Sequence, residues 1–181
     1  FSKLAFIVLT RLRRYVINDS VDGYRIPPKG SAKMRVYINE ELCMGCGLCR
    51  VYCQVEHSTS KDIIRAFKDE TPQPLPRIRI ERNGQHCFSI QCRHCDEPVC
   101  VYSCLTGAMT RDAVSGLITV DEKKCIGCWT CLLVCPLGAL SRDEGRHIIS
   151  KCDLCLGLEV PACVANCPNE ALTLSPVEAK A

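Results

Sequence analysis

The chain has 181 residues, and its 23 lysines and arginines against 20 aspartates and glutamates give a formal net charge of +3. Seventeen of the residues are cysteines, a content typical of disulfide-rich secreted chains and far above that of ordinary globular proteins. The basic residues do not gather in a patch with aromatic residues between them, so we expect no nucleic-acid partner. Two classes remain, a disulfide framework and a protein that binds metal through thiolates.

The first part of the chain, residues 1–33, contains no cysteine. Its apolar residues recur at helical spacing with basic residues between them, which is compatible with either a partner-docking helix or a simple N-terminal extension, followed by a linker at residues 27–31. The apolar run Leu4–Leu9 is too short to span a bilayer, and it precedes the Arg13-Arg14 pair, the reverse of a twin-arginine export signal. We therefore expect a cytoplasmic protein with no membrane anchor, whose cysteine-bearing domain occupies residues 34–181.

From Arg35 onward the chain repeats itself. Residues 36–46, VYINEELCMGC, parallel residues 118–128, ITVDEKKCIGC. Self-similarity of this kind indicates an internal duplication, with halves at 35–110 and 117–175. The first half is longer because of an insert at residues 54–86.

Regular elements are expected to be short. Within the insert, Lys61–Glu70 predicts a helix and Arg77–Glu81 alternates in the manner of a strand. Elsewhere the apolar alternation is brief, as at Val36–Ile38 and Leu117–Val120. These patterns favour an α+β fold in which bound metal replaces much of the core, so that removing the metal would unfold the protein.

Sixteen of the cysteines fall into four motifs. In chain order these are Cys43-x2-Cys46-x2-Cys49-x3-Cys53, Cys92-x2-Cys95-x4-Cys100-x3-Cys104, Cys125-x2-Cys128-x2-Cys131-x3-Cys135-Pro136 and Cys152-x2-Cys155-x7-Cys163-x3-Cys167-Pro168. Cysteines three residues apart are poorly placed to bridge each other, and an odd total also argues against full pairing. Three thiolates in a tight loop can instead hold three corners of one [4Fe–4S] cube, while the fourth points away and binds a neighbouring cluster.

Zinc is the alternative metal, because all-cysteine zinc sites also use C-x2-C pairs. Zinc ribbons join two separated pairs, however, whereas the first and third motifs place three cysteines within seven residues before a fourth. The motifs therefore indicate four [4Fe–4S] clusters. Since each oxidised cluster with four thiolates carries about −2, the loaded protein would have a net charge of about −5. A structural zinc or cysteine scaffold is the remote alternative, and it would be colourless.

Residues 35–175 resemble the four-cluster ferredoxin-like iron–sulfur subunits of the dimethyl sulfoxide reductase family. The resemblance lies in the motif residues and in two stretches around them, CRHCDEPVC at 92–100 and PACVANCP at 161–168. It implies a duplicated bacterial ferredoxin-like fold, with short strands and helices wrapped around the clusters. It also implies a non-catalytic subunit that relays single electrons between a catalytic oxidoreductase subunit and an electron donor or acceptor, such as a further redox subunit or a ferredoxin.

The resemblance also suggests which catalytic partner the chain serves. The best match is a tungsten aldehyde oxidoreductase-type enzyme, a group that includes benzoyl-CoA reductases, so a tungsten or molybdenum pterin subunit is expected. Carbon monoxide dehydrogenase, formate dehydrogenase and hydrogenase are the alternatives.

In that family the first motif pairs with the fourth, and the second with the third. The resemblance therefore implies four ligand sets, which are called the first to the fourth set. The first set is Cys43, Cys46, Cys49 and Cys167; the second is Cys53, Cys152, Cys155 and Cys163; the third is Cys92, Cys95, Cys100 and Cys135; the fourth is Cys104, Cys125, Cys128 and Cys131.

Several other residues are candidates for smaller roles. Cys87 lies outside the repeat and is interpreted as a buried structural thiol. Trp129 is expected to pack over a cluster, and His94, inside a ligand loop, either tunes a cluster by hydrogen bonding or is an ordinary loop histidine. Nothing predicts a catalytic residue, because no nucleophile–base pair or phosphate loop appears. Four basic residues adjoin ligands and could offset cluster charge, although ordinary surface charge is the default: Arg50, Arg93, Lys124 and Lys151.

Overall fold

The computed structural model describes residues 33–177 of the chain. The docking helix and linker expected near the N-terminus lie outside the described residues. The described part contains short strands and short helices, the longest of nine residues. The strands are β1 (Met34–Ile38), β2 (Ile78–Asn83), β3 (His86–Gln91), β4 (Met109–Arg111), β5 (Ile118–Val120), β6 (Leu140–Asp143), β7 (Ile148–Lys151) and β8 (Leu172–Pro176). The helices are α2 (Leu48–Glu56), α3 (Ile63–Lys68), α4 (Val99–Tyr102), α5 (Thr130–Val134) and α6 (Ala162–Ala165).

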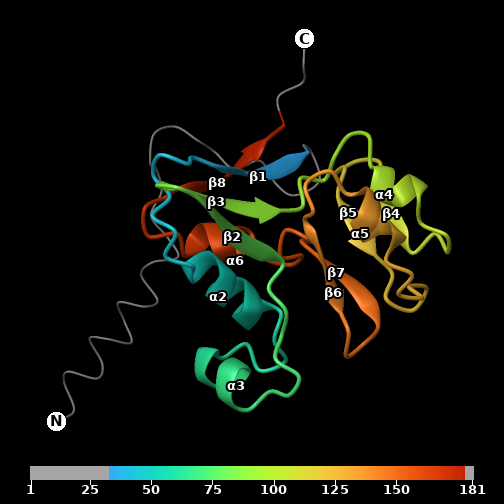
Figure 1. Ribbon diagram of the computed structural model, residues 1–181, viewed down its shortest axis with the longest axis horizontal. Coiled ribbons are helices and arrows are strands. Elements are labelled where there is room, and N and C mark those ends of the chain that lie inside the picture. The colour runs from blue at the N-terminus through green and yellow to red at the C-terminus, as the bar shows by residue number, and fades with distance from the viewer. Residues whose placement is uncertain (1–32, 178–181) are drawn as a thin grey trace.

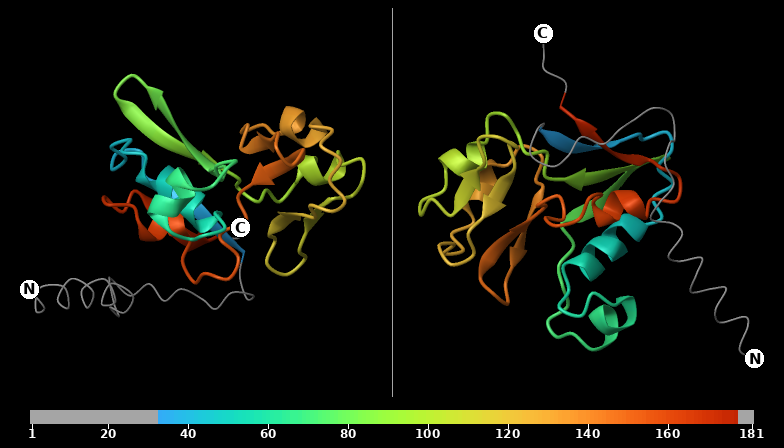
Figure 2. Two further views of the ribbon diagram at one scale, coloured as in Figure 1. Left: turned by 90° about the horizontal axis from the view of Figure 1, so that it is seen from below. Right: turned by 180° about the vertical axis from the view of Figure 1, so that it is seen from behind.

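These elements form two lobes (Figures 1 and 2). The first lobe contains β1, β2, β3 and β8 with helices α2, α3 and α6, and the second contains β4 to β7 with α4 and α5. All four sheets are two-stranded and antiparallel, pairing β1 with β8, β2 with β3, β4 with β5 and β6 with β7. Helix α2 contacts α6 in the first lobe, and α4 contacts α5 in the second.

The strand pairing brings distant parts of the chain together. The first described strand, β1, pairs with the last, β8, so that Val36 lies opposite Leu174. The chain leaves the first lobe after β3, builds the second lobe, and returns through motif four to α6 and β8 (Figure 1). The first and fourth motifs therefore share a lobe although 98 residues lie between Cys53 and Cys152.

Each lobe has its own apolar core, and both cores include cysteines. The first contains Val36, Cys49, Cys53, Ile78, Cys163, Leu172 and Leu174. The second contains Cys100, Met109, Ile118, Cys131, Leu140 and Ile149. Thiols thus occupy interior positions that apolar side chains would fill in an ordinary domain of this size.

The local elements follow from local sequence. Asp62 caps α3, because its side chain accepts hydrogen bonds from the N–H groups of Ile64 and Arg65 at 3.0 and 2.9 Å. This confirms the helix expected within Lys61–Glu70. The strand expected at Arg77–Glu81 appears as β2, which runs on to Asn83 because the hairpin continues until Asn83 faces His86. Among the described residues, none of the helices is both long and apolar enough to cross a lipid bilayer.

Candidate metal centres

The first set lines one cavity in the first lobe. Cys43, Cys46, Cys49 and Cys167 all face it, together with apolar side chains such as Ile38. Cys49 comes from the first turn of α2, and Cys167 comes from the loop after α6. The contact between α2 and α6 therefore joins a cysteine of the fourth motif to three cysteines of the first.

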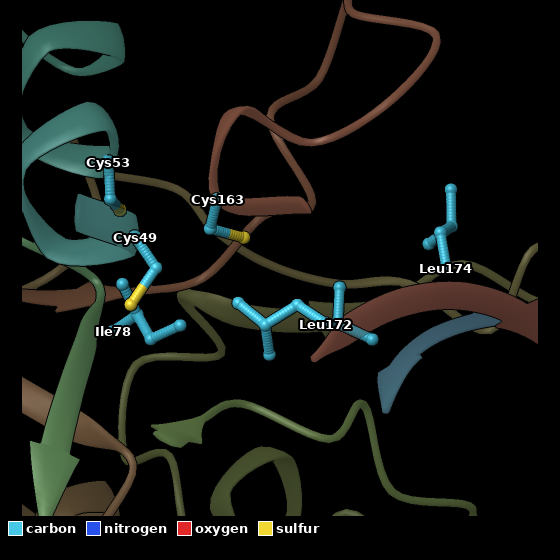
Figure 3. Packing of buried hydrophobic residues seen from close by; sticks show 7 residues of the cluster. Cys49, Cys53, Ile78, Cys163, Leu172 and Leu174 are labelled. Atoms are coloured by element: carbon cyan, nitrogen blue, oxygen red, sulfur yellow. The ribbon is translucent and has the colours of Figure 1, made fainter. Parts of the chain in front are cut away.

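The second set gathers deeper in the same lobe. Figure 3 shows Cys53 extending from α2 beside Cys49, and Cys163 extending from the α6 segment, with Ile78 and Leu172 close by. The N–H of Arg77 donates to Cys53 Sγ at 3.2 Å, and the N–H of Leu154 donates to Cys152 Sγ at 3.4 Å. Backbone N–H groups that donate to cysteine sulfur are one means by which proteins set the potential of an iron–sulfur cluster.

The third set lies at the side of the second lobe nearest the first. Burial, followed by the like charges of Cys92 and Cys135, raises the pKa of both Cys95 and Cys100, so these four thiols are neighbours. The N–H of Ala139 donates to Cys135 Sγ at 3.4 Å.

The histidine of this ligand loop is itself buried. His94 is 4% exposed, and its Nδ1 accepts the N–H of Ile118 at 3.0 Å. Its Nε2 has no hydrogen-bond partner in residues 33–177. Burial, and then the positive charge of Lys151, lower the pKa of His94 to about 3. The histidine is therefore neutral, with its proton on Nε2, and is not a solvated loop residue.

The fourth set lines a cavity in the second lobe. Its wall contains Cys104, Cys125, Cys128 and Cys131, with Trp129 among them. The N–H of Met109 donates to Cys104 Sγ at 3.5 Å, and the Thr130 hydroxyl donates to Cys128 Sγ at 3.4 Å. Trp129 thus borders the cavity as expected, held edge-on to His147 at a centroid distance of 5.3 Å.

The folded chain disfavours thiolates at the buried positions when no metal compensates them. Burial raises the pKa of Cys49 and Cys131 to about 11, and that of Cys53 and Cys152 to about 12. Because metal ligands must be deprotonated, a bound metal has to supply the opposing positive charge, and binding is thereby coupled to folding.

The four sets lie in the order of their names. Burial is the first cause that raises the pKa of Cys163, Cys152 and Cys131, and the like charge of a cysteine from a neighbouring set adds to it. Those neighbours are, respectively, Cys49 of the first set, Cys92 of the third and Cys100 of the third. The exposure of the cysteines agrees with this order. Cys46 of the first set and Cys128 of the fourth are exposed, while the second and third sets contain no exposed cysteine.

The spacing of the sulfurs distinguishes a cubane from a single zinc ion. Four thiolates around tetrahedral zinc lie about 3.8 Å apart, because each Zn–S bond is about 2.3 Å long. Within residues 33–177 no three cysteine sulfurs lie within 4.8 Å of one another. The sulfurs of the sets are thus not gathered at the spacing of a single zinc ion, and all-thiolate donor sets of four cysteines are the type that holds [4Fe–4S] cubes.

Cys87 is a buried thiol, as expected. It lies on β3 at 6% exposure, and its sulfur would be only 2.7 Å from a Cβ added to Gly45. The β2–β3 hairpin thus packs directly against the loop of the first motif, where Gly45 has a φ of 68°.

Three residues beside the second set went unrecognised in the sequence. His57 Nδ1 lies 2.8 Å from the Cys53 carbonyl oxygen, and its Nε2 lies 3.1 Å from Asp153 Oδ1. Arg77 also pairs with Asp153, at 2.5 Å. The spacing of four residues between Cys53 and His57 on one helix could have signalled this contact. No local pattern identifies the tertiary partners Asp153 and Arg77.

A further cavity is separate from the four sets. It has a volume of about 810 Å³ and lies between the segment after α3 and the β6–β7 hairpin. Two of its arginines are engaged by carboxylates, Arg77 by Asp153 and Arg146 by Asp143. Its lining residues do not include a recognisable pair of a nucleophilic side chain and a general base.

Comparisons with known proteins agree with this chemistry. The family described as "4Fe-4S dicluster domain" matches residues 84–176, and that described as "4Fe-4S binding domain" matches residues 36–56. The chain is 38% identical over 143 residues to "Putative electron transport protein YsaA" of Escherichia coli (strain K12), covering 75% of this chain and 85% of that one. It is 35% identical over 161 residues to the B subunit of anaerobic dimethyl sulfoxide reductase of the same organism, covering 78% of this chain and 73% of that subunit.

A more distant likeness is to a solved structure, the "Active site complex BamBC of Benzoyl Coenzyme A reductase in complex with Benzoyl-CoA". The identity is 22% and the TM-score 0.42, over 78% of each chain, values too low to bear on function. From the family matches and the curated relatives, the chain belongs to the ferredoxin-like iron–sulfur subunits of the dimethyl sulfoxide reductase family, which bind [4Fe–4S] clusters.

Proposed function

We propose that this chain relays single electrons through four [4Fe–4S] clusters, between a catalytic oxidoreductase subunit and an electron donor or acceptor. The observation that carries the proposal is the grouping of the cysteines, in which each group draws three thiols from one motif and one from another. Bound clusters would supply the one-electron chemistry. The chain would hold them, donate N–H groups to their sulfurs and exclude water from the inner pair.

The proposed ligands are the four sets named above, with an exchange of fourth cysteines between paired motifs. Cys167 would complete the cluster of the first motif, and Cys53 that of the fourth. Cys135 would complete the cluster of the second motif, and Cys104 that of the third. The cavities lined by the first and fourth sets are the strongest support, because each contains the exchanged cysteine and the three cysteines of the other motif.

The proposed path runs from the first set through the second and third to the fourth. The exposed thiols Cys46 and Cys128 mark the two outer clusters, where partners could exchange electrons with the chain. The inner clusters would be shielded at the junction of the lobes. Electron exchange with the outside would then occur only at the two ends of the path.

We also propose that residues 34–181 are one domain built by duplication of a bacterial ferredoxin-like unit, with halves 35–110 and 117–175 and an insert at 54–86. Outside the insert the order of elements supports this, because β1, α2, β3, α4 and β4 are matched in order by β5, α5, β7, α6 and β8. Strand β1 pairs with β8, and β4 with β5, so the start of each half meets the end of the other.

The catalytic partner is proposed to contain a molybdenum or tungsten pterin. The family name and the similarity to a dimethyl sulfoxide reductase subunit support this class. A tungsten aldehyde oxidoreductase-type enzyme, including the benzoyl-CoA reductase type, is the candidate that we put first. Carbon monoxide dehydrogenase, formate dehydrogenase and hydrogenase are the alternatives. Co-purification of the large subunit from the native source, with analysis of its metal, distinguishes these candidates.

Metal analysis tests the cluster count. Protein prepared without oxygen should contain about sixteen irons and sixteen acid-labile sulfides per chain, and it should show the broad visible absorption of sulfur-to-iron charge transfer. Twelve irons or fewer would contradict four cubanes. Colourless protein containing zinc would support the scaffold alternative instead.

A further inference from the structure

Lys151 is a buried lysine at the junction of the two lobes. It is the last residue of β7, directly before Cys152 of the second set, and only 4% of its surface is exposed. Within residues 33–177 no carboxylate lies within ion-pair distance of its ammonium group. A lysine is rarely buried to this extent without a partner.

The ammonium group takes part in a buried hydrogen-bond chain. Lys151 Nζ donates to the carbonyl oxygen of Cys152 at 2.7 Å and also to that of Ile118. Ile118 is 1% exposed, and its N–H donates to His94 Nδ1 at 3.0 Å. The chain therefore links motif four to motif two through the peptide groups of one residue on β5.

This position is next to both inner sets. Lys151 directly precedes Cys152 of the second set, and its ammonium group donates to the carbonyl oxygen of that residue. His94, at the far end of the hydrogen-bond chain, lies in the ligand loop between Cys92 and Cys95. Its protonated Nε2 lacks an acceptor in the described residues, and a cluster sulfur is an acceptor suited to that site.

The buried ammonium group of Lys151 requires a negative charge nearby. Burial of an ammonium group is unfavourable unless an anion and hydrogen-bond acceptors compensate it. Carbonyl oxygens accept two of its three hydrogens, but they provide no net negative charge. The carboxylates of Asp153 and Glu122 line the same cavity as Lys151, but each is paired with an arginine. The remaining anions would be the clusters with their four thiolates, each about −2 when oxidised.

We propose that Lys151 is a positioning residue that holds one positive charge between the two inner clusters, raises their reduction potentials and so favours electron passage between the lobes. This rests on the proposed four-cluster function. A cluster that accepts an electron gains one negative charge, and a fixed positive charge nearby stabilises the reduced form over the oxidised form. The electron leaves one cluster and enters its neighbour, and Lys151 itself is neither oxidised nor reduced.

The test compares three variants of the full holoprotein by potentiometric titration followed by electron paramagnetic resonance. Lys151→Gln removes the charge and keeps a hydrogen-bond donor, and Lys151→Arg keeps the charge. Lys124→Gln is the matched control, since Lys124 also directly precedes a ligand, Cys125, but is exposed and lies 3.5 Å from Asp121. Iron content is measured for each protein.

We expect Lys151→Gln to lower the reduced-to-oxidised ratio of at least one inner cluster about tenfold at fixed potential. That is the effect of a unit charge about 10 Å away at an effective dielectric constant of about 20, and it corresponds to about 59 mV for one electron. Lys151→Arg and Lys124→Gln should leave this reduced-to-oxidised ratio within about twofold of the wild-type value. If Lys151→Gln shifts no cluster more than Lys124→Gln does, the proposal is overturned.

Loss of iron is also decisive. If Lys151→Gln loses clusters while Lys151→Arg keeps them at wild-type potentials, the charge is required and the proposal stands. If Lys151→Arg loses them as well, the shape of the site matters instead of its charge, and the proposal fails. Failure of the four-cluster function itself would be seen separately, as too few irons or too few titrating clusters in the wild-type protein.

Discussion

Gly127 offers a quantitative test of how the β6–β7 hairpin encloses the loop of the third motif. This buried glycine has a φ of 63°, a left-handed conformation that an L-residue adopts only at a cost. A Cβ added there would collide with the backbone carbonyl oxygen of His147 and lie 2.6 Å from Cδ2 of the same residue. Gly47, in the loop of the first motif, has a φ of 79°, but nothing lies within 4 Å of an added Cβ.

The two glycines therefore separate backbone strain from collision. The left-handed conformation alone costs about 1–2 kcal/mol for a residue with a Cβ, and this applies to both Gly47→Ala and Gly127→Ala. Only Gly127→Ala must also displace a hairpin, and overpacking of this kind costs about 1–3 kcal/mol more. We expect a loss of unfolding free energy of about 1 kcal/mol for Gly47→Ala and about 3 kcal/mol for Gly127→Ala.

The measurement is the temperature at which the visible cluster absorption is lost, under anaerobic conditions and at one heating rate, because cluster loss is irreversible. At about 2–4 °C per kcal/mol for a chain of this size, the expected decreases are about 3 °C for Gly47→Ala and about 10 °C for Gly127→Ala. Equal decreases in the two variants would refute the inferred contact between the hairpin and the loop.

Three further outcomes follow from the proposed ligand sets. Cys87→Ser should leave iron content and electron transfer unchanged, because Cys87 packs against Gly45 and belongs to no set; loss of about four irons would mean that one of the sixteen ligands is misassigned. Cys167→Ala should alter the spectroscopic signal of the first-set cluster and leave the second set complete, whereas a structure with Cys167 on the cluster of Cys152 would contradict the exchange. Removal of iron with a chelator should abolish the far-ultraviolet circular dichroism of the folded chain, since cysteines occupy both cores, and an apoprotein that stays folded would disprove that coupling.

Much of the chemistry of this protein is readable from the sequence because cluster binding depends on local spacing. Three cysteines within seven residues hold one cube whatever surrounds them, so the motifs identify the metal class before any fold is known. Short strands and the insert helix were also predictable, because they depend on residues close together in the sequence. Asp62, for example, caps a helix that begins at the next residue. The proposed exchange of Cys167 and Cys53 between motifs required a resemblance to a known family, because spacing alone does not determine which distant motifs meet.

Only the tertiary structure determines what surrounds each set. In the sequence, Lys124 and Lys151 are equivalent, since each is a lysine directly before a proposed cysteine ligand. Folding leaves Lys124 exposed beside Asp121, while it buries Lys151 at the end of β7, where its hydrogen-bond partners within residues 33–177 are carbonyl oxygens. Burial is a property of packing between distant segments, here β5, β7 and the loop of His94, and it decides whether a charge is screened by water or acts on the clusters.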